Sequence, residues 1–503
     1  PPMPAPAAAT DPIHDVAVIG GGITGAAAAQ ALAQAGYSVV LLEADDFAAA
    51  TTSRTSRLQY CGLAYLFDFH QLRAIFKRPF VFLSRLFLVR RSMVERRHFL
   101  HTYPHRLKRV PFYIPLFEGD PVTPAKMRLA MMAMQAIDPL SPFEWQMIEG
   151  QELERLPVRS QPGKTVIGAV RYYDYAYAWP ERVCLDILAE ARAAGAVTLN
   201  YMLVRRMRRE DDVWSIDSLD RRRGETSTIR ARRVFNCAGP WLDSVAKGAG
   251  LDTPALNCGE KGANVALQLP ARYASIGLQV RDYQGAFYLI PWNDIHYVGP
   301  VNTITDANEP DSFRVTAHEL ERLKALIATY LPDDARQETL FSWAGTRPRT
   351  RNPVTGGPAA EPKLHGRDVT KLDGYFAYSG GLLMMYRSIG REILRAIRHS
   401  LPKRVPAYAK GSAGTVSVPS DADIALTPAG IRKMVREEGA WTLADILFRR
   451  TGLGWNADMG TSMLEPASRL LGVELGWTET ERIQAVAGYF HYLETEFGYR
   501  SDR

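Results

Sequence analysis

Asp15 to Ala44 reads D-V-A-V-I-G-G-G-I-T-G-A-A-A-A-Q-A-L-A-Q-A-G-Y-S-V-V-L-L-E-A. The apolar residues before the glycines predict a β-strand, the alanine-rich residues predict a helix, and a second apolar run predicts a strand that ends at Glu43. Gly20, Gly22 and Gly25 have the spacing G-x-G-x-x-G between the first strand and the helix. This order of elements is typical of a βαβ unit that binds a dinucleotide.

Each glycine has a physical reason to be there. Gly20 allows the tight turn, Gly22 lets the backbone approach a pyrophosphate, and Gly25 lets the helix lie close to the strand. The helix N-terminus offers N–H groups and the positive end of its dipole to the phosphates. Glu43 is placed to bind ribose hydroxyls and would repel a 2′-phosphate. The glycine spacing alone does not distinguish FAD from NAD.

A cluster of hydroxyl side chains follows Glu43. It contains Thr51, Thr52, Ser53, Thr55 and Ser56. Hydroxyls at the start of a helix can bind the second phosphate and the ribityl chain of FAD, or they can cap the helix and face solvent. The cluster therefore favours FAD and leaves the second interpretation open.

Six sequence blocks together resemble the FAD-dependent glycerol-3-phosphate dehydrogenase family. They are T-T-S-R-T-S-R-L-Q-Y-C-G-L-A-Y-L (51–66), N-C-A-G-P-W (236–241), K-G-A-N (261–264), I-P-W (290–292), W-A-G-T-R-P (343–348) and Y-S-G-G-L-L-M-M-Y-R (378–387). The ordered series covers nearly the whole chain and is far more specific than any one block. It implies that the cofactor is FAD.

The resemblance implies an α/β fold with three parts. Two domains lie within residues 13–402, and a helical domain lies within residues 403–503. A Rossmann-like FAD-binding domain is expected at about 13–109, 197–256 and 374–402, and an antiparallel-sheet substrate domain at about 110–196 and 257–373. This arrangement is that of the glutathione-reductase-like and D-amino-acid-oxidase-like flavoproteins. Pro, Gly and Ser in 403–420 predict a linker, and helical periodicity in 421–503 predicts a C-terminal helical domain.

The resemblance also implies the site residues. Those expected to bind FAD are Gly20, Gly22, Gly25, Glu43, Thr52, Ser53, Arg57, Gly239, Gly380 and Gly381. Those expected to be catalytic are Arg347, Tyr60, Lys261, Arg387 and Tyr386. Arg347 matches the family arginine taken to bind substrate beside the flavin, and the two tyrosines are the remaining polar candidates there.

Departures from the family pattern cluster in the expected substrate pocket. They are Tyr60 for His, Cys61 for Gly, Ala64 for Arg, Asn264 for His, Leu382 for Lys, and Met384 and Met385 for two Thr. Losing cations that hold a phosphate severely weakens the binding of a small dianion. We therefore expect a substrate that is larger and more lipophilic than glycerol 3-phosphate.

The leading hypothesis is an FAD-dependent oxidoreductase that transfers hydride from a secondary alcohol, polyol phosphate-like or glycerolipid-like, to flavin N5. Its expected electron acceptor is quinone or another oxidant. A flavin amine oxidase that uses oxygen is the first alternative, because a neutral amine needs no strong base. A membrane-associated scaffold that has lost catalysis is the second, because the pocket is depleted.

Residues 66–109 mix arginine and lysine with large apolar side chains. Two interpretations stay open for this segment: a core helix with a solvated basic face, or a helix lying in the headgroup layer of a membrane. Nucleic acid is not expected as a partner, because the aromatic residues of the segment are mainly phenylalanines without a recognisable stacking platform. The C-terminal helices are expected to act as a cap or as a dimer or partner surface, so a homodimer is a further candidate.

The composition sets limits on the remaining function classes. The chain has 503 residues, 46% hydrophobic and 23% charged, with a formal charge of +7. These values exclude disordered, collagen-like and disulfide-framework chains. Four cysteines without a C-x-x-C pair predict neither a metal site nor a disulfide scaffold and favour a reducing compartment.

The ends and the hydropathy complete the expectations from sequence. Residues 1–12 are rich in Pro and Ala and are expected to be a disordered leader, not a secretory signal. No apolar run approaches the roughly 18 to 20 residues that span a bilayer. We expect a cytoplasmic protein, with peripheral contact to the inner face of the cytoplasmic membrane as a further candidate.

Overall fold

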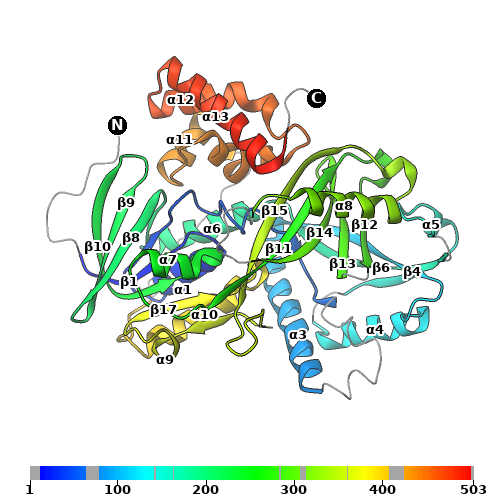
Figure 1. Cartoon of the computed structure of the whole chain (residues 1–503), viewed down its shortest axis with the longest axis horizontal. Coiled ribbons are helices and arrows are strands. Elements are labelled where there is room, and N and C mark those ends of the chain that lie inside the picture. The colour runs from blue at the N-terminus through cyan, green and yellow to red at the C-terminus, as the bar shows by residue number, and fades with distance from the viewer. Residues whose placement is uncertain are drawn as a thin grey trace.

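The computed structural model describes residues 12–63, 79–140, 143–161, 164–282, 285–305, 313–359, 361–406 and 424–499. Two sheets lie next to each other, and the C-terminal helices lie above their junction (Figure 1). The expected α/β architecture, with a dinucleotide-binding sheet, a largely antiparallel second sheet and C-terminal helices, is confirmed.

The first sheet has a parallel centre. Its strand order is β16-β17-β10-β1-β2-β7, and all neighbours except β16 and β17 are parallel. The strands are β1 (His14–Ile19), β2 (Val39–Leu42), β7 (Val197–Leu199), β10 (Glu225–Asn236), β16 (Lys363–His365) and β17 (Tyr375–Ser379). The centre of β1 is buried on both faces, as its unbroken apolar run predicts.

Helices cover both faces of the first sheet. On one face α1 (Ile23–Gln34) packs against α6 (Pro180–Ala193) and α10 (Tyr386–Arg398). On the other face, α7 (Leu242–Gly248) shares a core with β1 and β2. The antiparallel strands β8 (Met202–Glu210) and β9 (Val213–Asp220) extend the sheet from β10.

The second sheet is mainly antiparallel and has the order β15-β11-β14-β13-β12-β4-β6-β3, with β5 beside β6. Its strands are β3 (Leu58–Gln59), β4 (Leu107–Phe117), β5 (Trp145–Ile148), β6 (Val166–Tyr177), β11 (Asn257–Leu267), β12 (Gly277–Asp282), β13 (Gly285–Trp292), β14 (Ile295–Thr305) and β15 (Thr339–Thr350). One face packs against α8 (Ala317–Tyr330). The opposite face packs against α4 (Pro124–Ile137) and the C-terminal helices.

The described residues of the C-terminal part pack against the second sheet. Its elements are α11 (Pro428–Arg436), a π-helical turn (Asp445–Arg450), a 3₁₀ turn (Leu453–Trp455), α12 (Leu464–Leu475) and α13 (Glu479–Phe497). Buried side chains of these elements form one cluster with Phe341 and Trp343 of β15. Trp343 and Trp455 meet edge to face with ring centroids 5.6 Å apart. The C-terminal helices therefore share their core with the sheet that they cover.

At least three elements, β3, α6 and β16, lie on the other side of the expected domain boundaries. β3 falls in the stretch 13–109, expected in the FAD-binding domain, but it pairs with β6 of the second sheet. α6 falls in the stretch 110–196, expected in the substrate domain, yet it packs on α1, because a parallel strand such as β7 needs a helical crossover before it. β16 falls in 257–373 but pairs with β17 of the first sheet. Of the expected linker 403–420, residues 407–420 lie outside the described residues.

The basic segment 66–109 is described from residue 79 onward, where it forms α3 (Pro79–Thr102). Its second half is packed into the protein, with Val89, Met93 and Phe99 fully buried. Its first half exposes large apolar side chains, and Phe80 is 84% exposed. The second half of the helix is therefore part of the protein core, whereas the first half presents apolar side chains to solvent.

Candidate functional site

The glycine-rich turn lies at the carboxyl end of β1, where the neighbouring parallel strands also end. Gly20 has a φ of +106°, and a Cβ there would lie 2.6 Å from the carbonyl oxygen of Cys237, directly after β10. A Cβ on Gly25 would lie 1.9 Å from the carbonyl oxygen of Gly20. Only glycine therefore permits this close approach of helix, turn and strand.

The N-terminus of α1 is open to an anion. Its N-cap residue Gly22 supplies no side-chain hydrogen bond, and the first turn contains no acid. Thr52 Oγ1 accepts a hydrogen bond of 3.1 Å from the Ile23 N–H, so the predicted hydroxyl lies beside the helix start. A helix N-terminus of this kind attracts phosphate groups.

Glu43 is held against the glycine turn. Its Oε2 accepts the N–H of Gly21 at 2.6 Å, and its Oε1 accepts the N–H of Asp45 at 2.9 Å. Burial raises the pKa of Glu43 to about 7, although both backbone hydrogen bonds act in the opposite direction. The carboxylate is thus fixed at the end of β2, where a ribose is bound in dinucleotide sites.

Two of the predicted glycines that come later in the sequence lie close to the start of α1. Gly380 and Gly381 have φ values of +78° and +104°, and a Cβ on Gly381 would lie 2.8 Å from Thr24 Oγ1 in the first turn of α1. Gly239, with φ +58°, has open space where its Cβ would be. Residues from four distant stretches of sequence thus line one edge of the first sheet, as FAD requires.

These features fit FAD. The turn has no room for side chains other than hydrogen at Gly20 and Gly25, the N-cap residue Gly22 brings no side-chain cap and the first turn no acid, and Glu43 is fixed beside the turn. The residues that would hold the cofactor are the three glycines for the pyrophosphate, Thr52 beside the helix start and Glu43 for the ribose. FAD supplies a two-electron acceptor when it is bound.

We name residues 44–57 the hydroxyl loop. Two of its residues that were predicted to bind the cofactor, Ser53 and Arg57, contact other parts of the protein instead. Ser53 Oγ donates to Glu181 Oε1 on α6 at 2.8 Å. The Arg57 guanidinium is enclosed between the rings of Trp292 and Trp455, with centroid distances of 3.8 and 4.1 Å. Ser53 and Arg57 therefore hold the loop in place, whereas Thr52 faces the start of α1.

Arg347 lies on the side of the second sheet that meets the hydroxyl loop. A Cβ on Gly345, two residues earlier on β15, would lie 2.4 Å from the carbonyl oxygen of Arg54. Arg347 is opposite Glu260 of β11, with 3.4 Å between Nη1 and Oε2, and Arg349 reaches the same carboxylate at 3.3 Å. Two arginines and one glutamate therefore carry a single net positive charge.

Lys261 lies on the opposite face of the sheet from Arg347. The register pairs Lys261 with Thr346, so its side chain alternates to the other side of β11. There Lys261 Nζ lies 2.9 Å from Glu319 Oε2 on α8, and both side chains are buried. The structure does not bring these two predicted catalytic residues together.

Tyr60 and Cys61 follow β3 at the edge of the second sheet. Tyr60 is half-buried and meets the Tyr288 ring edge to face at 6.3 Å. The Cys61 N–H donates to Asp174 Oδ2 at 2.9 Å. Burial raises the pKa of the Cys61 thiol well above its ordinary value. Ala64 lies outside the described residues.

Tyr386 and Arg387 begin α10 and contact α3. Tyr386 is buried, with its ring 6.0 Å from that of Phe99, and burial raises the pKa of its phenol. Arg387 Nε lies 2.9 Å from Glu95 Oε2, and Ser388 Oγ donates to the same carboxylate. Both predicted residues therefore contact α3.

Several charged residues near the site were missed from the sequence. They are Glu95 and Arg96 of α3, Asp174 of β6, Glu181 of α6 and Glu260 of β11. Asp174 stands among four tyrosines in an alternating strand, and Glu95 is the single acid among the basic and apolar residues of 79–102. A lone acid in such a pattern signals a buried ion pair, although its partner cannot be read from the sequence.

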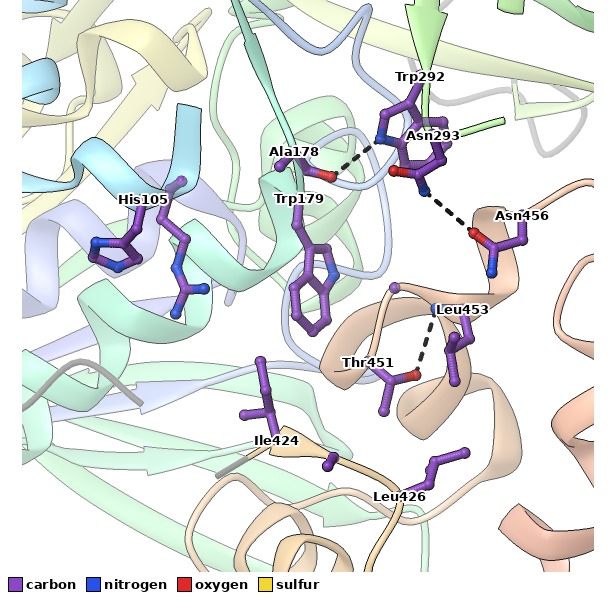
Figure 2. Close-up of a pocket in the computed structure, with 13 residues that line it drawn as sticks. His105, Ala178, Trp179, Trp292, Asn293, Ile424, Leu426, Thr451, Leu453 and Asn456 are labelled. Carbon is purple, nitrogen blue, oxygen red and sulfur yellow. Dashed lines mark hydrogen bonds between the residues drawn. The ribbon is translucent and has the colours of Figure 1, made fainter. Parts of the chain in front are cut away.

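A pocket of about 390 Å³ lies between the second sheet and the C-terminal helices (Figure 2). Trp179 and Trp292 line it, and the Trp292 indole N–H donates to the carbonyl of Ala178. Asn293 and Asn456 join across it with a hydrogen bond of 3.2 Å. None of the residues predicted as site residues lines this pocket, so it is distinct from the cofactor edge.

Among the described residues, no helix combines the length and the apolar character needed to cross a membrane. Nor do the described His, Cys, Asp and Glu side chains form a group of three or more suited to a metal ion.

Comparisons with known proteins agree with this geometry. The family model described as FAD dependent oxidoreductase matches residues 15–393, and that described as C-terminal domain of alpha-glycerophosphate oxidase matches residues 403–482. The chain is 25% identical to a glycerol-3-phosphate dehydrogenase of Synechocystis sp., covering 96% of each. It is 26% identical to D-erythritol 1-phosphate dehydrogenase of Brucella abortus, covering 77% of this chain and 74% of that one.

The fold has a solved counterpart. The glycerol-3-phosphate dehydrogenase from Bacillus halodurans, complexed with FAD, superimposes with a TM-score of 0.72 at 21% identity, over 96% of this chain and 95% of that one. The glycine turn, the Glu43 position and the matched residues 15–393 agree on the cofactor. The chain thus belongs to the FAD-dependent oxidoreductase family and is a divergent relative of its glycerol-3-phosphate dehydrogenases.

Proposed function

We propose that this enzyme oxidises a secondary alcohol that is larger and less charged than glycerol 3-phosphate, with a phosphodiester or glycerolipid-like head, and passes the hydride to FAD. The observation that carries the proposal is the position of Arg347. It lies two residues from the contact between Gly345 and the hydroxyl loop, on the same face of β15. A substrate held by Arg347 would therefore lie beside the cofactor edge.

The charge around Arg347 suits a monoanion better than a dianion. Arg347 and Arg349 share Glu260, so the three side chains together carry one net positive charge. An arginine can bind a phosphodiester through charge-assisted hydrogen bonds. A phosphate monoester carries nearly two negative charges at neutral pH and would need a second cation. This supports a phosphodiester head over a free phosphate.

Apolar side chains support a lipophilic substrate. Leu382, Met384 and Met385 follow Gly381 at the start of α10, and the two methionines are buried. Methionine adapts its shape to apolar ligands at low cost. The Tyr60 hydroxyl is the candidate hydrogen-bond partner of the substrate hydroxyl, and Arg347 would stabilise negative charge on that oxygen during proton loss.

The relatives favour an alcohol over an amine. The curated relatives named above act on glycerol 3-phosphate and D-erythritol 1-phosphate, so the amine oxidase alternative is not favoured. The scaffold alternative predicts bound FAD that no substrate reduces. We retain both as outcomes of the test below, and we retain quinone as the proposed electron acceptor.

We further propose that the first half of α3 and the exposed face of α4 contact a membrane surface. α3 projects from the lower edge of the molecule beside α4 (Figure 1), and Arg97 of α3 pairs with Asp138 directly after α4. The apolar side chains exposed there are Phe80, Leu83 and Phe87 of α3, Leu129 and Met132 of α4, and Leu140. Arg90, Arg91, Lys126 and Arg128 are exposed on the same two helices. Exposed apolar groups flanked by cations suit anionic lipid.

Anaerobic reduction of the bound flavin tests the reaction. The holoenzyme is mixed with glycerol 3-phosphate, a glycerophosphodiester, a monoacylglycerol or a primary amine, and the loss of the flavin's visible absorbance is followed. We expect reduction with the glycerophosphodiester or the monoacylglycerol, and at least tenfold slower reduction with the other two. Reduction by the amine alone would replace the proposal with an amine oxidase, and no reduction by any compound would favour the scaffold. The homodimer stays a prediction that sedimentation can check.

A further inference from the structure

The hydroxyl loop is bound on its outer side by three separate parts of the C-terminal helical domain. The first is the π-helical turn. Asp46, three residues after Glu43, accepts hydrogen bonds from Arg449 Nε at 2.5 Å and from Arg450 Nη2 at 2.7 Å. Asp46 and Arg450 are fully buried, so this contact is an internal ion pair between the two domains.

The second part is the 3₁₀ turn that carries Trp455. The Trp455 indole N–H donates to Glu181 Oε1 at 2.7 Å, and Ser53 of the loop donates to the same oxygen. The face of the Trp455 ring also lies 4.1 Å from the Arg57 guanidinium of the loop. One tryptophan therefore contacts the loop directly through Arg57 and indirectly through Glu181.

The third part is the end of α13. Arg54 Nη2 lies 2.7 Å from Glu496 Oε2, and the Arg54 guanidinium lies 5.1 Å from the centre of the Phe497 ring. Arg54 is buried, whereas Glu496 is at the rim with 22% of its side chain exposed. The contact thus joins the C-terminal helix to the middle of the loop.

The loop needs this support because parts of its backbone are strained. Ala48 and Arg57 have φ values of +59° and +56°, in the left-handed region that residues with a Cβ avoid. Such residues cost on the order of 1 kcal/mol each and persist only where the surroundings fix them. On its inner side the loop places Thr52 at the start of α1 and donates the Ala48 N–H to the Gly21 carbonyl. The strained conformation is therefore the one that meets the cofactor edge.

We propose that the C-terminal helical domain retains FAD by holding the hydroxyl loop in its cofactor-binding conformation. This differs from the cap, dimer or partner surface expected from the sequence, and it is independent of the substrate proposed above. Because such coupling is reciprocal, bound FAD should also strengthen the docking of the C-terminal helices.

FAD affinity of the full chain tests the proposal. Apoprotein is titrated with FAD, and the quenching of flavin fluorescence gives Kd for wild type, Glu496→Gln and Trp455→Phe. Both substitutions are mild: the first weakens the ion pair with Arg54, and the second removes the indole N–H but keeps an aromatic ring on Arg57. The matched control is Glu474→Gln, which weakens pairs with Arg432 and Arg436 inside the C-terminal domain. Circular dichroism confirms that each variant is folded.

We expect Kd to rise at least fivefold in Glu496→Gln and in Trp455→Phe, and to change less than twofold in Glu474→Gln. We also expect FAD to slow proteolytic cleavage of the C-terminal helices in wild type and less so in the two loop variants. Kd values within twofold of wild type in both folded variants would overturn the proposal. An equal rise of Kd in Glu474→Gln would also overturn it, because the weaker FAD binding would then follow from destabilisation of the C-terminal domain as a whole.

Discussion

The Arg96 guanidinium of α3 and the Asp174 carboxylate of β6 form an ion pair of 3.2 Å, and both side chains are buried. The same carboxylate accepts the Cys61 N–H at 2.9 Å. One acid therefore joins α3, the second sheet and the turn that carries Tyr60. Its partner on α3 stands next to Glu95, which binds Arg387 of α10. α3 thus links the two sheets through adjacent residues of opposite charge.

Asp174→Asn should strongly destabilise the protein. The substitution leaves the Arg96 charge buried without a counter-charge, a change that costs about 3 to 5 kcal/mol. Urea unfolding measures the difference. Asp217→Asn, which breaks the exposed pair with Arg208, is the control and should change the free energy of unfolding by less than about 1 kcal/mol. Equal effects of the two substitutions would contradict the role assigned to the buried pair.

Arg347→Ala should lower kcat/KM at least a hundredfold for the alcohol that reduces the flavin, because a charge-assisted contact to the substrate would be lost. Arg349→Ala removes the other arginine on Glu260 and should cost less than tenfold. Steady-state kinetics with an artificial electron acceptor measure both. If the loss is larger for Arg349, then Arg349 and not Arg347 holds the substrate.

Lys261→Met should affect stability and leave KM nearly unchanged. Lys261 is buried with Glu319 on the α8 side of the sheet, so its removal leaves a buried carboxylate without its cation. We expect a fall in the thermal unfolding midpoint and a change in KM of less than threefold. A tenfold rise in KM with unchanged stability would place Lys261 in the substrate site after all.

Glu43 should make the stability of the apoprotein depend on pH. Burial raises its pKa from 4.5 to about 7. The folded state therefore binds the proton more tightly than the unfolded state, so the stabilisation is complete below about pH 4.5 and is lost as the pH rises through about 7. Relative to Glu43→Gln, the wild-type apoprotein should lose on the order of 1 to 3 kcal/mol between pH 5 and pH 7.5. Urea unfolding at several pH values measures this difference. If the free energy of unfolding changes equally with pH in both proteins, Glu43 does not cause the pH dependence.

Replacing Phe80 and Phe87 by serine should abolish most binding to anionic vesicles. Each phenylalanine contributes about 1.5 to 3 kcal/mol when its exposed surface enters an apolar layer, so the pair should change the partition constant more than tenfold. Co-sedimentation with phosphatidylglycerol vesicles measures it. The control replaces Val473 and Ile483, which are exposed on α12 and α13, by serine. Unchanged binding of the phenylalanine variant would exclude α3 as the membrane surface.

Much of the first sheet could be predicted from the sequence, because local rules govern it. The glycine spacing required a tight turn, the apolar runs required buried strands, and Glu43 ended the second strand. These features depend on residues that are close together in the chain, so their pattern is visible before the chain folds.

The sequence by itself determined the dinucleotide-binding βαβ unit and the helical C-terminus. The tertiary structure decided which groups meet: Lys261 and Arg347 were separated by the pairing of β11 with β15, and Arg57 was placed between two tryptophans from distant segments. Side chains alternate across a strand, so the face of each residue follows from strand register. That register, like the partner of a buried charge, is set by contacts between residues far apart in the sequence.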